Sequence, residues 1–125
     1  MEELRHERNA YLYEFGPFLV DRVKCVLLRE EQIVPISMKT FEILLVLIEH
    51  RGQVVEKDEL LKQVWPDTIV EENNLTRHVS ALRKALDEQP TEHRYILTIP
   101  GRGYRFVADV KEVEPVPRNL IQSTV

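Results

Sequence analysis

The feature that most constrains this fold is a helix pattern followed directly by a glycine-bounded hairpin pattern, between residues 73 and 106. A stripe of apolar residues at helical spacing packs one face of a helix against a core. In this segment the stripe consists of Leu75, Val79, Leu82 and Leu86. We therefore expect a buried helix that ends where acidic residues return, at Asp87 and Glu88.

The opposite, polar face of this helix carries no acidic residue between Asn73 and Leu86. Asn73 and Asn74 are both favourable N-caps, so we expect the helix to begin there. Its free backbone N–H groups and positive dipole end could then bind a phosphate. The polar face consists of Asn73, Asn74, Thr76, Arg77, Ser80 and Lys84, with Arg83 on one flank and His78 nearer the core edge.

The hairpin pattern has strand-forming residues at 94–99 and 104–108, separated by Pro100-Gly101-Arg102-Gly103. The two glycines permit positive φ and let the backbone approach a ligand closely. Arg102 is left at the tip, and Arg105 should point away from the core because aromatic residues flank it on both sides. A helix beside an arginine-bearing ribbon is suited to gripping duplex DNA, which favours DNA contact over a solvated surface for Arg77 and Arg102.

The rest of the chain predicts a small antiparallel sheet followed by two helices. Ser37 is a plausible N-cap for a strongly apolar helix that ends before Gly52, and a second helix from Lys57 to Trp65 stops at Pro66. Four strand patterns precede them, at Tyr11 to Phe15, Phe18 to Asp21, Val26 to Leu28 and Ile33 to Ile36. The predicted fold class is α+β, with a four-stranded N-terminal sheet, a three-helix bundle and a C-terminal hairpin.

The chain divides into one domain and two flanking segments. Residues 1–10 form a charged leader, residues 11–110 the domain, and residues 111–125 a flexible linker or tail with two prolines. Inside the domain, the connection from Pro66 to Glu71 is longer than the tight turn of the simplest helix-turn-helix.

Charge is distributed unevenly along the 125 residues, whose net charge is −4. Residues 1–72 hold 9 Lys and Arg against 15 Asp and Glu, whereas residues 73–106 hold 6 against 3. Binding depends on the field at the contact surface, so a basic edge on an acidic body is compatible with DNA and should weaken non-specific association. The single cysteine, Cys25, cannot form an internal disulfide, which fits a reducing cytoplasm.

The sequence gives little support for an enzyme or a membrane protein. Its four histidines, at positions 6, 50, 78 and 93, lack metal-ligand spacing, so we expect no metal and no cofactor. The glycines of the hairpin turn lead into a strand and lack the later glycine of a dinucleotide-binding motif. The longest apolar run, Ile43 to Ile48, is far shorter than a membrane span.

Several strings in register resemble the C-terminal effector domain of OmpR/PhoB-type regulators. They are Phe15 to Phe18, Ser37 to Leu45, Gly52 to Val55, Glu59 to Leu61, Val64-Trp65, Val79 to Leu86 and Gly101 to Phe106. The resemblance covers about residues 11 to 109, which makes it stronger than any single motif. The sequence from Thr98 to Tyr104 also resembles that of the CadC/ToxR-like branch of these regulators.

This resemblance implies a winged helix-turn-helix that binds double-stranded DNA, in tandem on direct repeats with self-association on the DNA. It implies major-groove contacts by Asn73, Asn74, Thr76, Arg77, Ser80 and Lys84. It implies backbone contacts by His78, Arg83 and Arg105, and minor-groove contact by Arg102 at the wing. It also implies a loop that contacts RNA polymerase, consisting of Pro66, Asp67, Thr68, Ile69, Val70 and Glu71.

The sequence departs from the family pattern at the groove and at the wing. Ser80 and Ala81 stand where better-known members often carry basic residues, and Pro100 where some carry arginine. The first strand pattern begins about ten residues into the chain, so we expect no receiver domain and no phosphorylation switch in it.

Alternatives remain open for two side chains and for the whole chain. Arg83 could contact a phosphate or pair with a carboxylate inside the domain, and His78 could contact a phosphate or pack in the bundle. The chain could instead be a winged-helix protein-interaction module that uses its acidic first half. It could also be the cytoplasmic DNA-binding fragment of a membrane-anchored sensor.

Overall fold

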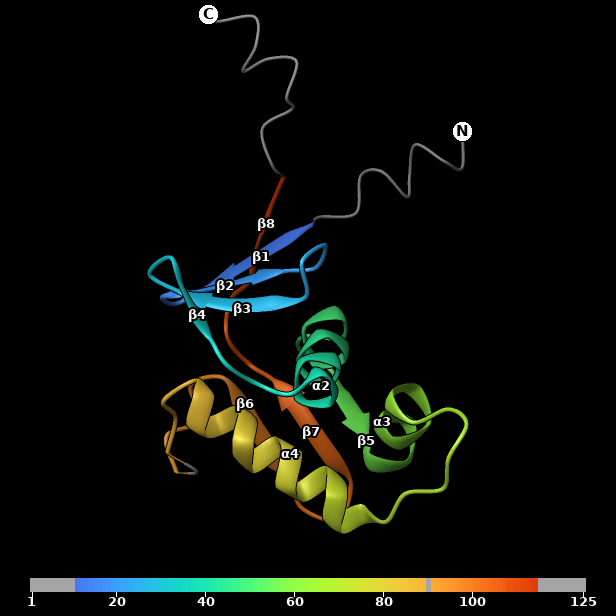
Figure 1. Ribbon diagram of the computed structural model, residues 1–125. Coiled ribbons are helices and arrows are strands. Elements are labelled where there is room, and N and C mark those ends of the chain that lie inside the picture. Colours follow the sequence, from blue (N-terminus) through green and yellow to red (C-terminus); the bar gives the residue numbers. More distant parts are fainter. Residues whose placement is uncertain (1–10, 90, 115–125) are drawn as a thin grey trace, which may run out of the picture.

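A computed structural model describes residues 11–89 and 91–114, which form three helices and eight strands. The helix α2 (Met38–Glu49) lies at the centre of the molecule, with the N-terminal sheet on one side and the other two helices on the other (Figure 1). The elements are β1 (Leu12–Phe15), β2 (Phe18–Asp21), β3 (Val26–Arg29), β4 (Gln32–Val34), α2 (Met38–Glu49), β5 (Val54–Glu56), α3 (Lys57–Val64), α4 (Glu72–Ala85), β6 (Ile96–Ile99), β7 (Gly103–Phe106) and β8 (Lys111–Val113).

The N-terminal sheet contains the four predicted strands and one more, in the order β4-β3-β2-β1-β8. The fifth strand corrects the assignment of residues 111–113 to a flexible linker, because β8 pairs antiparallel with β1 and places Val113 opposite Leu12. Three residues are too short to show a periodic pattern, and the pairing instead satisfies the open backbone edge of β1. Residues 1–10 and 115–125, predicted as leader and tail, lie outside the described residues.

The core forms where the N-terminal sheet and the wing meet α2. Ser37 caps this helix as predicted, because its hydroxyl accepts the Thr40 N–H at 3.2 Å. Seven of its twelve residues are buried, so α2 is the central helix of the core. An aromatic cluster joins the two sheets, with Phe15 in edge contact with Tyr95 and with Phe106 at ring centroid distances of 5.5 Å and 5.1 Å.

The predicted hairpin is part of a three-stranded sheet in the order β5-β7-β6, because a strand precedes α3 that the sequence patterns did not reveal. The tight pairing of β5 with β7 explains Gly103. A Cβ at this position would lie 2.0 Å from the Val55 carbonyl oxygen, so the glycine admits a neighbouring strand rather than the predicted ligand. Gly101 does adopt positive φ, at +76°, and turns the chain at the wing tip.

Candidate nucleic-acid interface

The helix that carries the predicted groove residues, α4, begins at Glu72, and Glu71 occupies its N-cap position. This corrects the prediction that Asn73 and Asn74 are caps, since both lie inside the first turn. No side chain caps the helix, and Glu72 stands in the first turn, where the positive end of the dipole favours an acid. The acid-free stretch therefore runs from Asn73 to Leu86 and is preceded directly by two carboxylates.

The two faces of α4 are divided as the periodicity predicts. Leu75, Val79 and Leu82 are buried against the bundle. The predicted groove residues all share the exposed surface, namely Asn73, Asn74, Thr76, Arg77, Ser80 and Lys84. The structure thus brings these six side chains together on one accessible face, and their contact with DNA stays a prediction.

His78 is held inside the bundle. Its Nδ1 lies 2.9 Å from the Thr40 hydroxyl, and its ring centroid is 5.5 Å from that of Trp65. The Ser37 hydroxyl donates to the Thr40 hydroxyl at 3.0 Å, which leaves the Thr40 proton directed at Nδ1. The hydrogen bond and the ring contact supply the packing role that was one of the two alternatives.

Arg83 also has its partners inside the domain, and its side chain is only 14% exposed. The Nη2 atom donates to the Ile96 carbonyl at 3.2 Å and to the Thr98 hydroxyl at 2.7 Å. Its Nε atom lies 3.9 Å from the carboxylate of Glu88 and makes no hydrogen bond. Arg83 therefore fastens α4 to β6, which matches the intradomain alternative.

Glu88 is a buried structural residue, although the sequence pattern predicted only that the helix ends there. Its carboxylate accepts the backbone N–H groups of Tyr95 and Ile96. The turn that delivers it is a Schellman motif, in which Asp87 has a left-handed φ of 56° and the Glu88 N–H donates to the Arg83 carbonyl at 2.9 Å. The sequence signal that could have indicated this role is an acidic residue placed between the end of a helix and the start of a strand.

The wing carries Arg102 at its tip, with a side chain that is 60% exposed. Its Nη2 atom lies 3.3 Å from a carboxylate oxygen of Glu56. The Arg102 carbonyl accepts the Lys57 N–H at 2.9 Å, so the tip is tied to the start of α3. Arg105 is half-buried between the buried Tyr104 and Phe106, and the alternation places it on the other face of the sheet, as predicted.

A second exposed ion pair joins the start of α3 to the start of α4. The Lys57 Nζ atom donates to the Glu72 carboxylate at 2.8 Å. This hydrogen bond is the main cause that raises the pKa of Lys57 above its ordinary value of 10.5, so the ammonium is charged at every physiological pH. Glu56, Lys57 and Glu72 were all absent from the predicted site.

The sequence of this domain matches one protein-family model over most of its length. The model describes the C-terminal domain of transcriptional regulatory proteins and matches residues 30–106. The chain belongs to this family. Its function is that of the DNA-binding domain of a transcriptional regulator.

Individual members of the family share both sequence and fold with this chain. The transcriptional regulator HilA of Salmonella typhimurium is 48% identical over 89 residues, which are 71% of this chain and 16% of HilA. The response regulator DrrB of Thermotoga maritima, an OmpR/PhoB homologue, is 34% identical with a TM-score of 0.74, over 83% of this chain and 47% of DrrB. The DNA-binding domain of Escherichia coli CadC is 28% identical with a TM-score of 0.72, over 84% of this chain and 99% of that domain.

These similarities confirm the predicted resemblance to OmpR/PhoB-type regulators and the winged-helix fold class. The chain spans about one sixth of HilA and just under half of DrrB. Among residues 11–89 and 91–114, no helix is long and apolar enough to cross a membrane.

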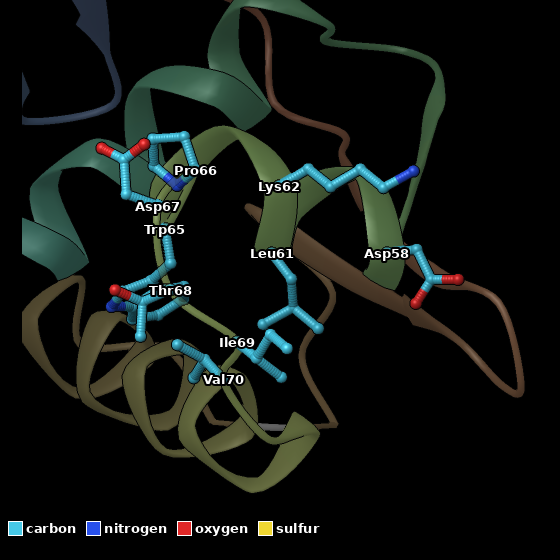
Figure 2. A pocket seen from close by; sticks show the side chains of 9 residues that line it. All are labelled: Asp58, Leu61, Lys62, Trp65, Pro66, Asp67, Thr68, Ile69 and Val70. Carbon is cyan, nitrogen blue, oxygen red and sulfur yellow. The ribbon is translucent and has the colours of Figure 1, made fainter.

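Residues 66–70 of the predicted polymerase-contact loop line an open hollow beside α3 (Figure 2). The helix contributes Asp58, Leu61 and Lys62, and the chain from Trp65 to Val70 forms the rest of the lining. Ile69 is fully exposed at the loop, at 101% of its reference surface. Single exposed apolar side chains are common on protein surfaces, and contact of this loop with RNA polymerase stays a prediction.

Proposed function

We propose that this domain binds double-stranded DNA sequence-specifically, with α4 in the major groove and the β6–β7 wing in the adjacent minor groove. One observation carries the proposal: from Asn73 on, α4 exposes a face of polar and basic side chains without an acid, directly beside an arginine-tipped wing. A helix fits the major groove of B-DNA, which is about 12 Å wide. The family membership supports the same docking.

Each predicted contact residue has a chemical role in this docking. Arg77 can bind guanine in a bidentate manner, and the amides of Asn73 and Asn74 can do the same with adenine. Residues near the N-terminal end of a recognition helix are the ones that contact base edges. Thr76, Ser80 and Lys84 complete the major-groove surface, Arg102 enters the minor groove, and Arg105 contacts the backbone. Because Arg83 and His78 have intradomain partners, their share of the backbone contacts is the smallest.

The same proposal includes the protein partners and the place of action. The loop from Pro66 to Glu71 offers Ile69 and the hollow beside Trp65 to RNA polymerase. Neighbouring copies of the domain bind direct repeats and contact one another on the DNA. The domain acts in the cytoplasm, either free or tethered to a membrane by the remainder of a longer protein.

The test is a titration of the 125-residue chain with fluorescent duplexes, one selected from a random library and one of random sequence. Arg77→Ala should weaken binding to the selected duplex by about 10- to 100-fold, because a lost bidentate base contact has that effect. Arg102→Ala should weaken binding to both duplexes by a similar, smaller factor. Lys24→Ala, in the β2–β3 turn of the N-terminal sheet, removes the same charge and should change nothing.

Three results would count against this docking. If Arg77→Ala and Arg102→Ala bind like the parent chain, α4 and the wing do not contact DNA. Equal losses with Lys24→Ala would mean that net charge alone governs binding. The absence of salt-sensitive binding to any duplex would favour a protein-interaction module that uses the acidic first half.

A further inference from the structure

Four charged side chains of alternating sign connect the wing tip to the first turn of α4. Arg102 pairs with Glu56 at 3.3 Å, and Lys57 pairs with Glu72 at 2.8 Å. Glu56 and Lys57 are consecutive at the junction of β5 and α3, so the two pairs form one chain of charges. The wing and α4 are the two elements that the proposed docking places on DNA.

The fold fixes this arrangement through the backbone. Strand pairing sets Glu56 opposite Gly103, the residue after Arg102. The Lys57 N–H donates to the Arg102 carbonyl at 2.9 Å, which holds the wing tip at the start of α3. Main-chain contacts therefore place Glu56 beside Arg102, whereas Glu72 reaches Lys57 through its side chain.

Other cations of the proposed DNA-binding surface, on α4 and the wing, differ from Arg102 and Lys57 because they have no carboxylate partner among the described residues. Within residues 11–89 and 91–114, Arg77, Lys84 and Arg105 form no ion pair with any carboxylate. The carboxylates thus stand beside two specific cations, at the wing tip and at the start of α3, and the exposed cations Arg77 and Lys84 of α4 have no carboxylate beside them in the part of the chain that the structure describes. A carboxylate bound to a cation occupies the position that a DNA phosphate would take.

We propose that Glu56 and Glu72 act as internal competitors for DNA phosphates, which neutralise Arg102 and Lys57 in the free domain and so limit its affinity for any duplex, whatever the sequence. This inference rests on the proposed DNA binding. A phosphate that approaches Arg102 or Lys57 must displace a carboxylate or meet its repulsion. A cation that is already neutralised also releases fewer counterions from the DNA.

The carboxylates should leave sequence preference unchanged, because phosphate contacts carry no direct sequence information. Base edges are instead contacted by Arg77 and the polar side chains of α4, which have no acidic partner. An unchanged sequence preference distinguishes the competitor role from a second role for Glu72, in which its carboxylate accepts a hydrogen bond from cytosine. Such a role would change the preferred sequence when Glu72 is replaced.

The experiment measures the affinity of Glu56→Gln, Glu72→Gln and the double variant for a random-sequence duplex, across salt concentrations. Each single variant should bind about 3- to 10-fold more tightly at low salt, with a salt slope steeper by about one phosphate contact. The gain should shrink as salt rises, because screening weakens the repulsion. The ratio of affinities for the selected and random duplexes should stay constant, and Glu56→Asp should behave like the parent chain.

Two matched controls isolate the carboxylates from net charge. Glu31→Gln lies in the β3–β4 turn, is exposed and makes the same change of charge, so it should leave affinity unchanged. In an Arg102→Ala background, Glu56→Gln should have no effect, because the cation that it would release is gone. Thermal melts of every variant confirm that these exposed substitutions leave the domain folded.

The outcomes distinguish this inference from the docking on which it rests. If the parent chain binds DNA with salt sensitivity but Glu56→Gln and Glu72→Gln bind no more tightly, the competitor role is wrong and the docking stands. Equal gains with Glu31→Gln would also overturn it. If neither the parent chain nor any variant binds a duplex, the docking itself fails.

Discussion

The two ends of α4 are fastened to the rest of the domain by opposite means. At the C-terminal end, the buried carboxylate of Glu88 and the largely buried guanidinium of Arg83 bind the backbone of β6. At the N-terminal end, Glu72 reaches Lys57 through an ion pair at the surface, in which the side chains are 59% and 24% exposed. The first end fixes where the wing stands relative to the helix, and the second can exchange its partners for those of a ligand.

Physical magnitudes explain why the two ends behave differently. A buried polar group left without its partner costs about 1–3 kcal/mol, and breaking a buried ion pair costs about 3–5 kcal/mol. Exposed pairs such as Arg102 with Glu56 contribute about 0–1 kcal/mol and are screened by salt. Stability therefore depends on the C-terminal fastening, whereas the charges at the N-terminal end are free to serve binding.

The largest effect on stability should come from Glu88→Ala. This change leaves the N–H groups of Tyr95 and Ile96 without an acceptor and Arg83 without its countercharge, so we expect a loss of about 3–5 kcal/mol. Urea denaturation followed by circular dichroism measures it. A loss below about 1 kcal/mol would contradict the assignment of a buried fastening, and Glu31→Ala serves as the exposed control.

A smaller loss is expected for Arg83→Met, which keeps an apolar stem but removes the donors to Ile96 and Thr98. We expect about 2–3 kcal/mol, because a neutral replacement still leaves Glu88 buried without a cation. The same denaturation experiment tests it. Combined with Glu88→Ala, the two losses should be clearly less than additive, and full additivity would show that the residues act independently.

The exposed end should contribute little to folding. A double-mutant cycle of Arg102→Ala and Glu56→Gln should give a coupling free energy below about 1 kcal/mol in unfolding experiments. A coupling of 2 kcal/mol or more would mean that this ion pair holds the wing in place. The comparison between the two ends would then fail.

The smallest effect concerns pH and Lys57. Its pKa is raised in the folded state, mainly by the hydrogen bond to Glu72, so its contribution is present below about pH 10.5 and is lost as the pH rises through the higher folded value. Stability of the parent chain and of Lys57→Met should therefore differ by the same small amount from pH 7 to pH 9. A difference that changed within that range would contradict the assignment.

The helices and the four strands of the N-terminal meander could be predicted from the sequence, whereas two isolated short strands could not. The buried faces of α2 and α4 follow directly from their apolar stripes, and those of β1 to β3 follow from alternation. Strands β5 and β8 have three residues each, and only their pairing with β7 and β1 makes them strands. The start of α4 was placed too late because asparagines are good caps, but the chain already turns helical at Glu72.

The candidate site divides in the same way. The exposed face of α4 follows from helical spacing, so its six side chains were found together. The ion pairs were missed because they join residues far apart in sequence, 15 positions for Lys57 with Glu72 and 46 for Glu56 with Arg102. No local pattern signals such a pair, because β5 and α3 must first fold against the wing.

The pairing of β8 with β1 has a practical consequence for attaching other groups. Val113 lies opposite Leu12, so the polypeptide enters and leaves the described domain at neighbouring positions on β1 and β8, at one edge of the N-terminal sheet. That edge belongs to the sheet on the far side of α2 from α4 (Figure 1). A fluorophore or an affinity tag joined next to either strand is thereby carried on the back of the molecule, clear of the helix and wing.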